Sequence, residues 1–80
     1  MSANVFISGL QSRLAREALN LSIKAVAKEA DLGVNTISRF ETTNNVGAAR
    51  TVRKLVEVYS RRGMEFPDTR TVRFPEHITA

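Results

Sequence analysis

Apolar residues over most of the chain recur at helical spacing. Between positions 8 and 62 they return three and four residues apart, and this stretch contains no proline. Such spacing places them on one face of an α-helix. The pattern predicts a first helix that begins at Ser8, followed by helices over about 23–30, 34–41 and 48–62. We therefore expect a mainly α fold of four to five helices.

Capping residues mark the start of the first two helices. Ser8 followed three residues later by Gln11 is a capping box, in which each side chain bonds to the backbone N–H of the other. Ser22 is suited to cap the second helix, and Asn20 suits the turn between the two. The first helix then carries one apolar stripe, formed by Leu10, Leu14, Ala18 and Leu21.

The later helices each show an apolar face. A tight connection over 31–33 joins the second helix to the third. Gly63 is well placed just beyond the fourth helix, where a glycine accepts a left-handed backbone. The expected inward residues of the three helices are Val26, Ala27, Ala30, Ile37, Phe40, Val52, Leu55, Val56 and Tyr59.

The pattern changes after Gly63. Two prolines appear, and alternating apolar residues predict two short strands over 64–66 and 71–74. We expect a C-terminal β-hairpin there, with a disordered tail as the alternative. A chain of 80 residues has room for a single domain, 1–80. Its helical core would cover about 9–62 and its β extension about 63–75.

Composition narrows the function. Twelve Lys and Arg against eight Asp and Glu give a net charge of +4, which favours polyanionic partners such as nucleic acid. The chain has no cysteine and one histidine, His77, so we expect no metal site and no cofactor. We find no nucleophile–base pair and expect no enzyme. No apolar run reaches the ~20 residues of a membrane span, which favours a cytoplasmic protein without membrane contact.

Two short helices joined by a tight turn within a basic helical domain have the layout of a helix-turn-helix. The second and third predicted helices form such a pair in the stretch AVAKEADLGVNTISRFE, residues 25–41. The informative residues are Arg16, Leu21, Ser22, Val26, Ala27, Ala30, Thr36, Ile37, Ser38, Arg39 and Glu41. Through them, about residues 9–62 resemble the Cro/phage-repressor type of helix-turn-helix, the xenobiotic-response-element family.

Three positions depart from the family pattern. Ile23 stands where the family usually has a glutamine that supports a phosphate and a base contact. Asp31 replaces the turn glycine, and Gly33 replaces the Ser or Thr that caps the third helix. These departures weaken the transfer of individual phosphate contacts, but they leave the expected fold unchanged.

The resemblance implies that the third helix enters the major groove and reads bases with its outward face. Arg39 suits guanine and Asn35 suits adenine, because each can form two hydrogen bonds to that base. Val34 offers an apolar surface to a thymine methyl group. The expected base-reading set is Val34, Asn35, Thr36, Ser38 and Arg39.

Phosphate contacts are expected where the family holds the DNA backbone, at the start of the second helix and before the fourth. The expected set is Arg13, Ser22, Ile23, Lys24, Thr43, Asn44, Asn45 and Arg50. Arg16 and Glu41 look like a family ion pair that ties the first helix to the end of the third. The alternative for these two is a pair of unrelated surface charges.

Together these features predict a sequence-specific double-stranded DNA-binding transcriptional regulator of a phage, mobile element or bacterial operon. A homodimer on a palindromic operator is expected, because one helix reads only a few base pairs. The apolar residues of the hairpin are the expected dimer contacts, with packing of the hairpin on its own domain as the alternative: Met64, Phe66, Val72 and Phe74. The alternative is a protein-interaction module, an antitoxin or anti-activator acting through helix 48–62 or the hairpin. Repression and activation both stay open.

Overall fold

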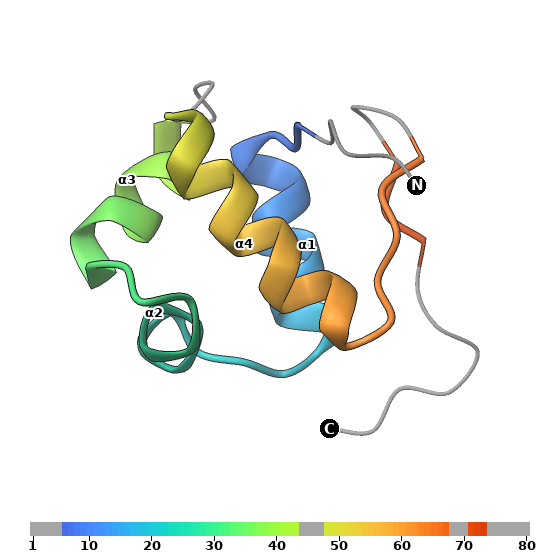
Figure 1. The fold of residues 1–80 in the computed structure, drawn as a ribbon, viewed down its shortest axis with the longest axis horizontal. Coiled ribbons are helices and arrows are strands. Elements are labelled where there is room, and N and C mark those ends of the chain that lie inside the picture. The colour runs from blue at the N-terminus through green and yellow to red at the C-terminus, as the bar shows by residue number, and fades with distance from the viewer. Residues whose placement is uncertain (1–5, 44–47, 68–70, 74–80) are drawn as a thin grey trace.

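Four helices follow one another along the chain (Figure 1). The computed structural model describes residues 6–43, 48–67 and 71–73. The helices are α1 (Gly9–Ala18), α2 (Ile23–Ala30), α3 (Val34–Thr43) and α4 (Ala49–Arg61). In Figure 1, α4 crosses the front of the molecule with α1 behind it, and α2 and α3 lie to one side. Both α1 and α2 pack against α3 and against α4.

The predicted capping box at Ser8 is confirmed. The Ser8 hydroxyl accepts a hydrogen bond from the backbone N–H of Gln11 at 3.1 Å, and the backbone N–H of Ser8 donates to Gln11 Oε1 at 2.8 Å. After α1 the chain reverses at Asn20, whose φ of 59° is left-handed. Ser22 caps α2 as predicted, because its hydroxyl accepts from the N–H of Ala25 at 3.0 Å.

The turn before α3 follows the prediction. Asp31 adopts a left-handed φ of 57°, a conformation that Asp and Asn tolerate better than most residues. It thereby closes the turn where the resembled family usually has a glycine. The helix α3 continues to Thr43, beyond the end expected near Glu41. Gly63 follows α4 with a φ of 91°, which confirms its expected place.

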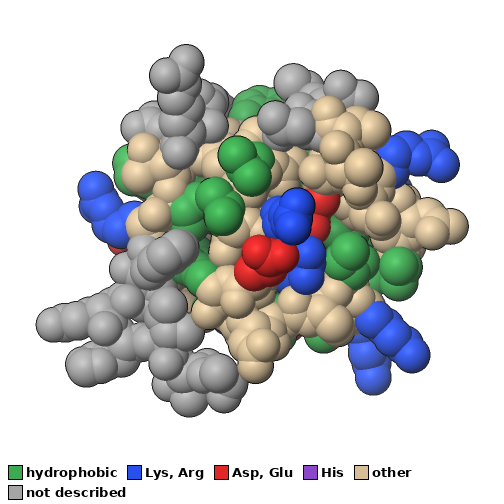
Figure 2. All heavy atoms as spheres, turned by 180° about the vertical axis from the view of Figure 1, so that it is seen from behind, with side chains coloured by type: hydrophobic (Ala, Val, Ile, Leu, Met, Phe, Trp, Pro, Cys, Tyr) green, Lys and Arg blue, Asp and Glu red, His purple; other side chains and the backbone are tan. Residues whose placement is uncertain are grey.

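The apolar stripe read along the first helix is not the buried face of α1. Leu10 is 52% exposed and Leu14 is 44% exposed. Hydrophobic side chains are visible on the rear face of the molecule, where α1 lies (Figure 2). The buried residues of α1 are instead small or polar: Gly9, Gln11, Ser12 and Ala15. Small side chains let α1 approach its neighbours closely, and the polar ones find hydrogen-bond partners inside.

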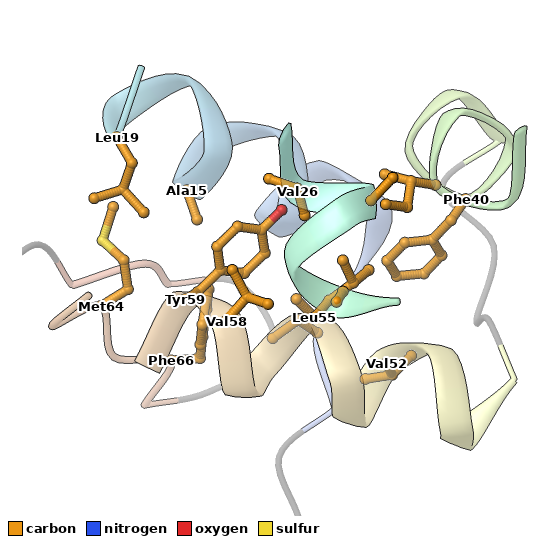
Figure 3. Close-up of a cluster of buried hydrophobic side chains, with 14 residues drawn as sticks. Ala15, Leu19, Val26, Phe40, Val52, Leu55, Val58, Tyr59, Met64 and Phe66 are labelled. Atoms are coloured by element: carbon orange, nitrogen blue, oxygen red, sulfur yellow. The ribbon is translucent and has the colours of Figure 1, made fainter. Parts of the chain in front are cut away.

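The hydrophobic core lies between α4 and the other three helices (Figure 3). The inward residues expected on α2 and α3 are buried, as are Val52, Leu55 and Tyr59 of α4. Val56 is only partly buried, and Val58, which the sequence pattern did not single out, is fully buried. Ile37 and Phe40 anchor α3 from beneath, with exposed fractions of 0% and 5%.

Backbone meets backbone where the start of α1 crosses the end of α3. Gly9 is buried there, and a Cβ added to it would overlap the carbonyl oxygen of Phe40. The same Cβ would lie 3.0 Å from the Cα of Glu41. Only glycine allows this approach.

The expected C-terminal β-hairpin is wrong. Among the described residues the segment after α4 makes one isolated antiparallel bridge, between Glu65 and Arg73, and forms no strand. Pro67 has no N–H to donate to a ladder. The carbonyl of Thr71 accepts instead from the side chain of Gln11 at 2.9 Å. Side-chain packing and this bond hold the segment on the domain.

The residues expected to form a dimer contact lie mostly in the protein's own core. Met64 is 2% exposed and Phe66 is 9% exposed, and the rings of Phe66 and Tyr59 pack 6.2 Å apart (Figure 3). Val72 is partly buried against the same cluster. Phe74 lies outside the described residues. Met64 and Phe66 are therefore not available on the surface for a second subunit.

We expect Gly9→Ala to destabilise the fold by about 1–3 kcal/mol or more, because the added methyl group must push α1 away from α3. The matched control is Gly33→Ala, whose Cβ would meet only Thr36 Oγ1 at 3.5 Å. Urea unfolding of both variants measures the difference. Equal midpoints for the two variants would contradict the close approach.

Candidate nucleic-acid interface

The outer face of α3 consists of polar side chains around one apolar residue. Asn35, Thr36 and Arg39 are exposed, and Val34 is 45% exposed at the first position of the helix. Ser38 is half-buried beside them. Because Ile37 and Phe40 fix the inner face, these five predicted base-reading residues share the outer side of one helix or its edge.

An open hollow of about 250 Å³ lies between this face and the start of α4. Residues with hydroxyl, amide and guanidinium groups line it together with one aromatic residue. Its lining residues are Asn35, Thr36, Arg39, Phe40, Thr43 and Thr51. These groups are mainly hydrogen-bond donors, which suits an anionic or hydrogen-bonding surface.

Positive charge on the helix-turn-helix side is left without carboxylate partners. In the described part of the chain, every acidic residue except the exposed Glu57 forms an ion pair with a cation of α1, of α4 or of the segment after it. The described cations outside these ion pairs are Lys24, Lys28, Arg39, Arg50 and Arg53. Such uncompensated cations create a positive potential near α2, α3 and the start of α4.

Four of the predicted phosphate residues lie at two helix starts: Ser22, Ile23 and Lys24 at α2, and Arg50 at α4, whereas Thr43 ends α3. Lys24 is exposed in the first turn of α2, while Ile23 packs against the core. Arg50 is exposed in the first turn of α4, which Ala48 precedes without a side-chain cap. The N–H groups at such a start favour anions. Ser22 and Thr43 are not buried either, whereas Asn44 and Asn45 lie outside the described residues.

Arg13 takes a different position. It lies on the outer side of α1 and pairs with Glu17, whose Oε2 is 3.1 Å from its Nε. Both side chains are more than half exposed, at 60% and 52%. This neighbour reduces the charge that Arg13 offers to a phosphate.

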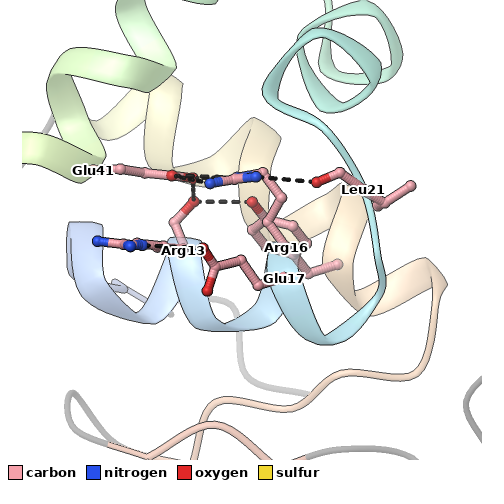
Figure 4. Close-up of polar contacts among 7 residues, drawn as sticks. Arg13, Arg16, Glu17, Leu21 and Glu41 are labelled. Atoms are coloured by element: carbon pink, nitrogen blue, oxygen red, sulfur yellow. Dashed lines mark hydrogen bonds and ion pairs between the residues drawn. The ribbon is translucent and has the colours of Figure 1, made fainter.

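Arg16 and Glu41 form an ion pair beneath the exposed face of α3 (Figure 4). Arg16 Nη2 is 2.9 Å from Glu41 Oε1, and the side chains are 13% and 5% exposed. The guanidinium also donates to the carbonyl of Leu21 at 3.0 Å. A planar guanidinium can bind a carboxylate and a carbonyl at once, so Arg16 connects α1, the turn before α2 and α3.

Two further members of this network were not identified from the sequence. The Ser12 hydroxyl donates to Glu41 Oε2 at 2.9 Å and lies 2.9 Å from the hydroxyl of Tyr59. Ser12 is four residues before Arg16, so the two share one face of α1. That spacing is the sequence signal from which Ser12 could have been assigned to the network. The network thus joins α1, α3 and α4 around the Glu41 carboxylate, below the exposed face of α3.

Burial and hydrogen bonding shift two pKa values in the network. Burial raises the pKa of Tyr59 to about 12, although the Ser12 hydroxyl acts in the opposite direction. The hydrogen bond to Glu41 raises the pKa of Arg16, which therefore stays charged. At neutral pH the network holds a neutral phenol beside a paired carboxylate and guanidinium.

A family model described as a helix-turn-helix domain matches residues 9–65. The chain belongs to the helix-turn-helix domain family. The match covers all four helices and the first residues after α4. A search of curated proteins and a search of solved structures found no match.

A helix-turn-helix domain is in general a DNA-binding regulatory unit rather than a catalytic one. None of the described helices has the length and apolar character to cross a membrane. Within the described part of the helix-turn-helix domain, no group of three His, Cys, Asp or Glu is placed to hold a metal ion.

The raised pKa of Tyr59 predicts a loss of stability at alkaline pH. The unfolded phenol titrates near pH 10 and the folded one near pH 12, so folding is fully supported below pH 10 and weakens as the pH rises between these values. The expected loss is about 2–3 kcal/mol.

Tyr59→Phe serves as the comparison, since it removes the titrating group from the chain's one tyrosine position. Its stability, lowered at neutral pH by the lost hydrogen bond, should depend less on pH over this interval. Urea unfolding at several alkaline pH values gives the comparison, and the ultraviolet absorbance of tyrosinate reports the titration. Parallel stability curves for the two proteins would contradict the prediction.

Proposed function

We propose that the protein is a sequence-specific double-stranded DNA-binding transcriptional regulator of the Cro/phage-repressor type, serving a phage, mobile element or bacterial operon. The observation that carries the proposal is the outer face of α3. It combines exposed Asn35 and Arg39 with nearby cations that lack carboxylate partners among the described residues. A selection of bound fragments from random-sequence DNA tests the proposal, and recovery of no common sequence would contradict it.

In the proposed complex α3 lies in the major groove. The Arg39 guanidinium binds guanine O6 and N7, and the Asn35 amide binds adenine N6 and N7. Val34 contacts a thymine methyl group, while Thr36 and Ser38 add less selective hydrogen bonds. The hollow beside α3 exposes Arg39 and Asn35 to the same side, which supports simultaneous contacts with neighbouring base pairs.

Backbone contacts hold α3 in register. Lys24 at the start of α2 and Arg50 at the start of α4 approach the phosphates that flank the groove, with Ser22 and Thr43 adding hydrogen bonds. Such contacts position the protein but carry no sequence information. Ile23 stands where the resembled family usually has a glutamine. The phosphate contact at the start of α2 therefore falls to the backbone N–H groups there and to Lys24.

We also propose that the active form is a homodimer on a palindromic operator. A single α3 reads only a few base pairs, and two half-sites double the information that is read. The contact between subunits must use a surface other than the buried Met64 and Phe66.

Arg39→Ala should weaken binding to the selected operator by about 1–3 kcal/mol while leaving binding to random DNA nearly unchanged. The matched control is Arg53→Ala, another exposed arginine outside the described ion pairs that has no assigned base. Fluorescence anisotropy titrations with both DNAs measure the two affinities. An equal loss on operator and random DNA would exclude base reading by Arg39.

Lys24→Ala and Arg50→Ala should lower affinity for all sequences alike. Each removes about one phosphate contact, so the slope of log affinity against log salt concentration should fall by about one unit per variant. Titrations across a salt series provide the slopes, with Arg73→Ala, which changes an exposed arginine of the segment after α4, as the control. Slopes equal to that of the parent protein would place these cations away from the DNA backbone.

A further inference from the structure

Ser12 carries a buried hydroxyl that the proposed DNA contacts do not use. It lies on α1, and its exposed fraction is 0%. Gly9 precedes it by three positions and Arg16 follows it by four, so the three residues share one face of α1. That face meets the end of α3, where Gly9 approaches the backbone and Arg16 binds Glu41. Ser12 therefore lies in the middle of the junction between the two helices.

The two oxygens of the Glu41 carboxylate are held by different side chains. Oε1 accepts from Arg16 Nη2 at 2.9 Å, and Oε2 accepts from the Ser12 hydroxyl at 2.9 Å. Arg16 Nε lies 3.2 Å from Oε1 and 3.1 Å from Oε2 (Figure 4). Arg16 reaches the carboxylate through a long side chain with many rotamers, whereas a single torsion connects the Ser12 hydroxyl to the helix backbone. Ser12 is therefore the shorter and stiffer of the two links between α1 and α3.

The direction of the hydrogen bonds at Ser12 follows from its single proton. A carboxylate can only accept, so the Ser12 hydroxyl donates to Glu41. The oxygen of Ser12 then accepts from the Tyr59 hydroxyl, which lies 2.9 Å away. Burial raises the pKa of Tyr59 to about 12, which keeps this phenol protonated as a donor. A chain of two hydrogen bonds thus runs from α4 through α1 to the carboxylate on α3.

A rotation of α3 at Glu41 moves the proposed base-reading residues by the same angle. Two residues advance an α-helix by about 200°, so Arg39 lies on nearly the opposite side of α3 from Glu41. Asn35 lies about one turn before Arg39, on the same face. A recognition site must be held within about 0.5 Å and 10–20° of its productive geometry. The side chains that fix Glu41 therefore also fix the backbone that carries Arg39 and Asn35.

We propose that Ser12 is a positioning residue for base discrimination, which acts through Glu41, and that Tyr59 keeps the Ser12 proton directed at the carboxylate. This inference rests on the proposed function, because it assigns a role in reading the operator to residues that do not contact DNA. Without Ser12, Arg16 still attaches α3 to α1, but Glu41 Oε2 retains only the donor Nε. The domain then stays folded while the orientation of α3 is less well defined.

Ser12→Ala should lower the ratio of operator affinity to random-DNA affinity by about three- to tenfold, because Glu41 loses a charge-assisted hydrogen bond. It should also lower stability, since the buried Tyr59 hydroxyl is left without its acceptor. The double variant Ser12→Ala/Tyr59→Phe removes that hydroxyl and should regain stability relative to Ser12→Ala. Its affinity ratio should stay as low as that of Ser12→Ala, because Glu41 still lacks the hydrogen bond. Fluorescence anisotropy titrations and urea unfolding measure the two properties separately.

Met64→Val is the matched control for a loss of stability alone. Met64 is buried at the end of the core that lies away from Phe40 (Figure 3). The smaller side chain should lower the urea midpoint, because it removes buried apolar contacts. The ratio of operator affinity to random-DNA affinity should stay at the value of the parent protein.

Hydrogen exchange of the backbone amides tests the positioning without DNA. In the double variant the amides of α3 should exchange about three- to tenfold faster, relative to those of α2, than they do in the parent protein. Met64→Val should change the exchange of the two helices alike, because it lowers only the stability of the whole domain.

Two results would overturn the inference. One is a double variant whose affinity ratio returns to the parent value together with its stability, since the network would then support the fold alone. The other is an equal change of exchange in α2 and α3. A selection from random-sequence DNA that recovers no common sequence contradicts the proposed function instead, and the exchange of α3 then still decides whether Ser12 positions this helix.

Discussion

The carboxylate of Glu41 holds three helices at one point. It accepts hydrogen bonds from Arg16 and Ser12 of α1, and Ser12 in turn meets the hydroxyl of Tyr59 on α4. A carboxylate that is 5% exposed would be costly to bury alone, and here both of its oxygens are satisfied. The position of α3 relative to the rest of the domain depends on this arrangement.

The close approach of α1 and α3 belongs to the same constraint. Gly9 lets the two backbones touch beside Glu41, so the distance over which Arg16 and Ser12 reach the carboxylate is fixed. Ile37 and Phe40 then lock the inner face of α3 from below. Rigid support from behind turns the exposed residues of α3 into a surface of defined geometry. Under the proposed function, such rigidity is what lets α3 discriminate between base sequences.

Local sequence signals predicted most of the helical fold. The caps at Ser8 and Ser22, the turn at Asp31 and the inward residues Ile37 and Phe40 are determined by neighbours within a few positions. The buried face of α1 was missed, because Gln11 and Ser12 are buried for their distant hydrogen-bond partners rather than for hydrophobicity. The prediction of a C-terminal hairpin was wrong for a related reason. Alternation after Gly63 indicates a half-buried extended segment, whether or not a second strand pairs with it.

The residues proposed to contact DNA could be selected from the sequence only through the helix-turn-helix pattern. Their exposure can be predicted, because the inward residues of α3 fix which side of the helix faces outward. The bases that they contact cannot be predicted, because these depend on the DNA sequence. Pairing of the acidic residues elsewhere on the surface is a three-dimensional property. Glu29 pairs with Arg62, which lies 33 positions later in the chain, and Asp31 with Lys54, which lies 23 positions later.

The side chain of Gln11 links the start of α1 to the segment after α4. Its side-chain oxygen accepts from Ser8 at the start of α1, and its nitrogen donates to the carbonyl of Thr71, 60 positions away. One amide thus ties the first helical turn to the last described segment. Opening of either segment removes one of the hydrogen bonds that this amide makes, so the two segments support each other through Gln11. A non-covalent contact thus links two segments of the chain that are far apart in sequence.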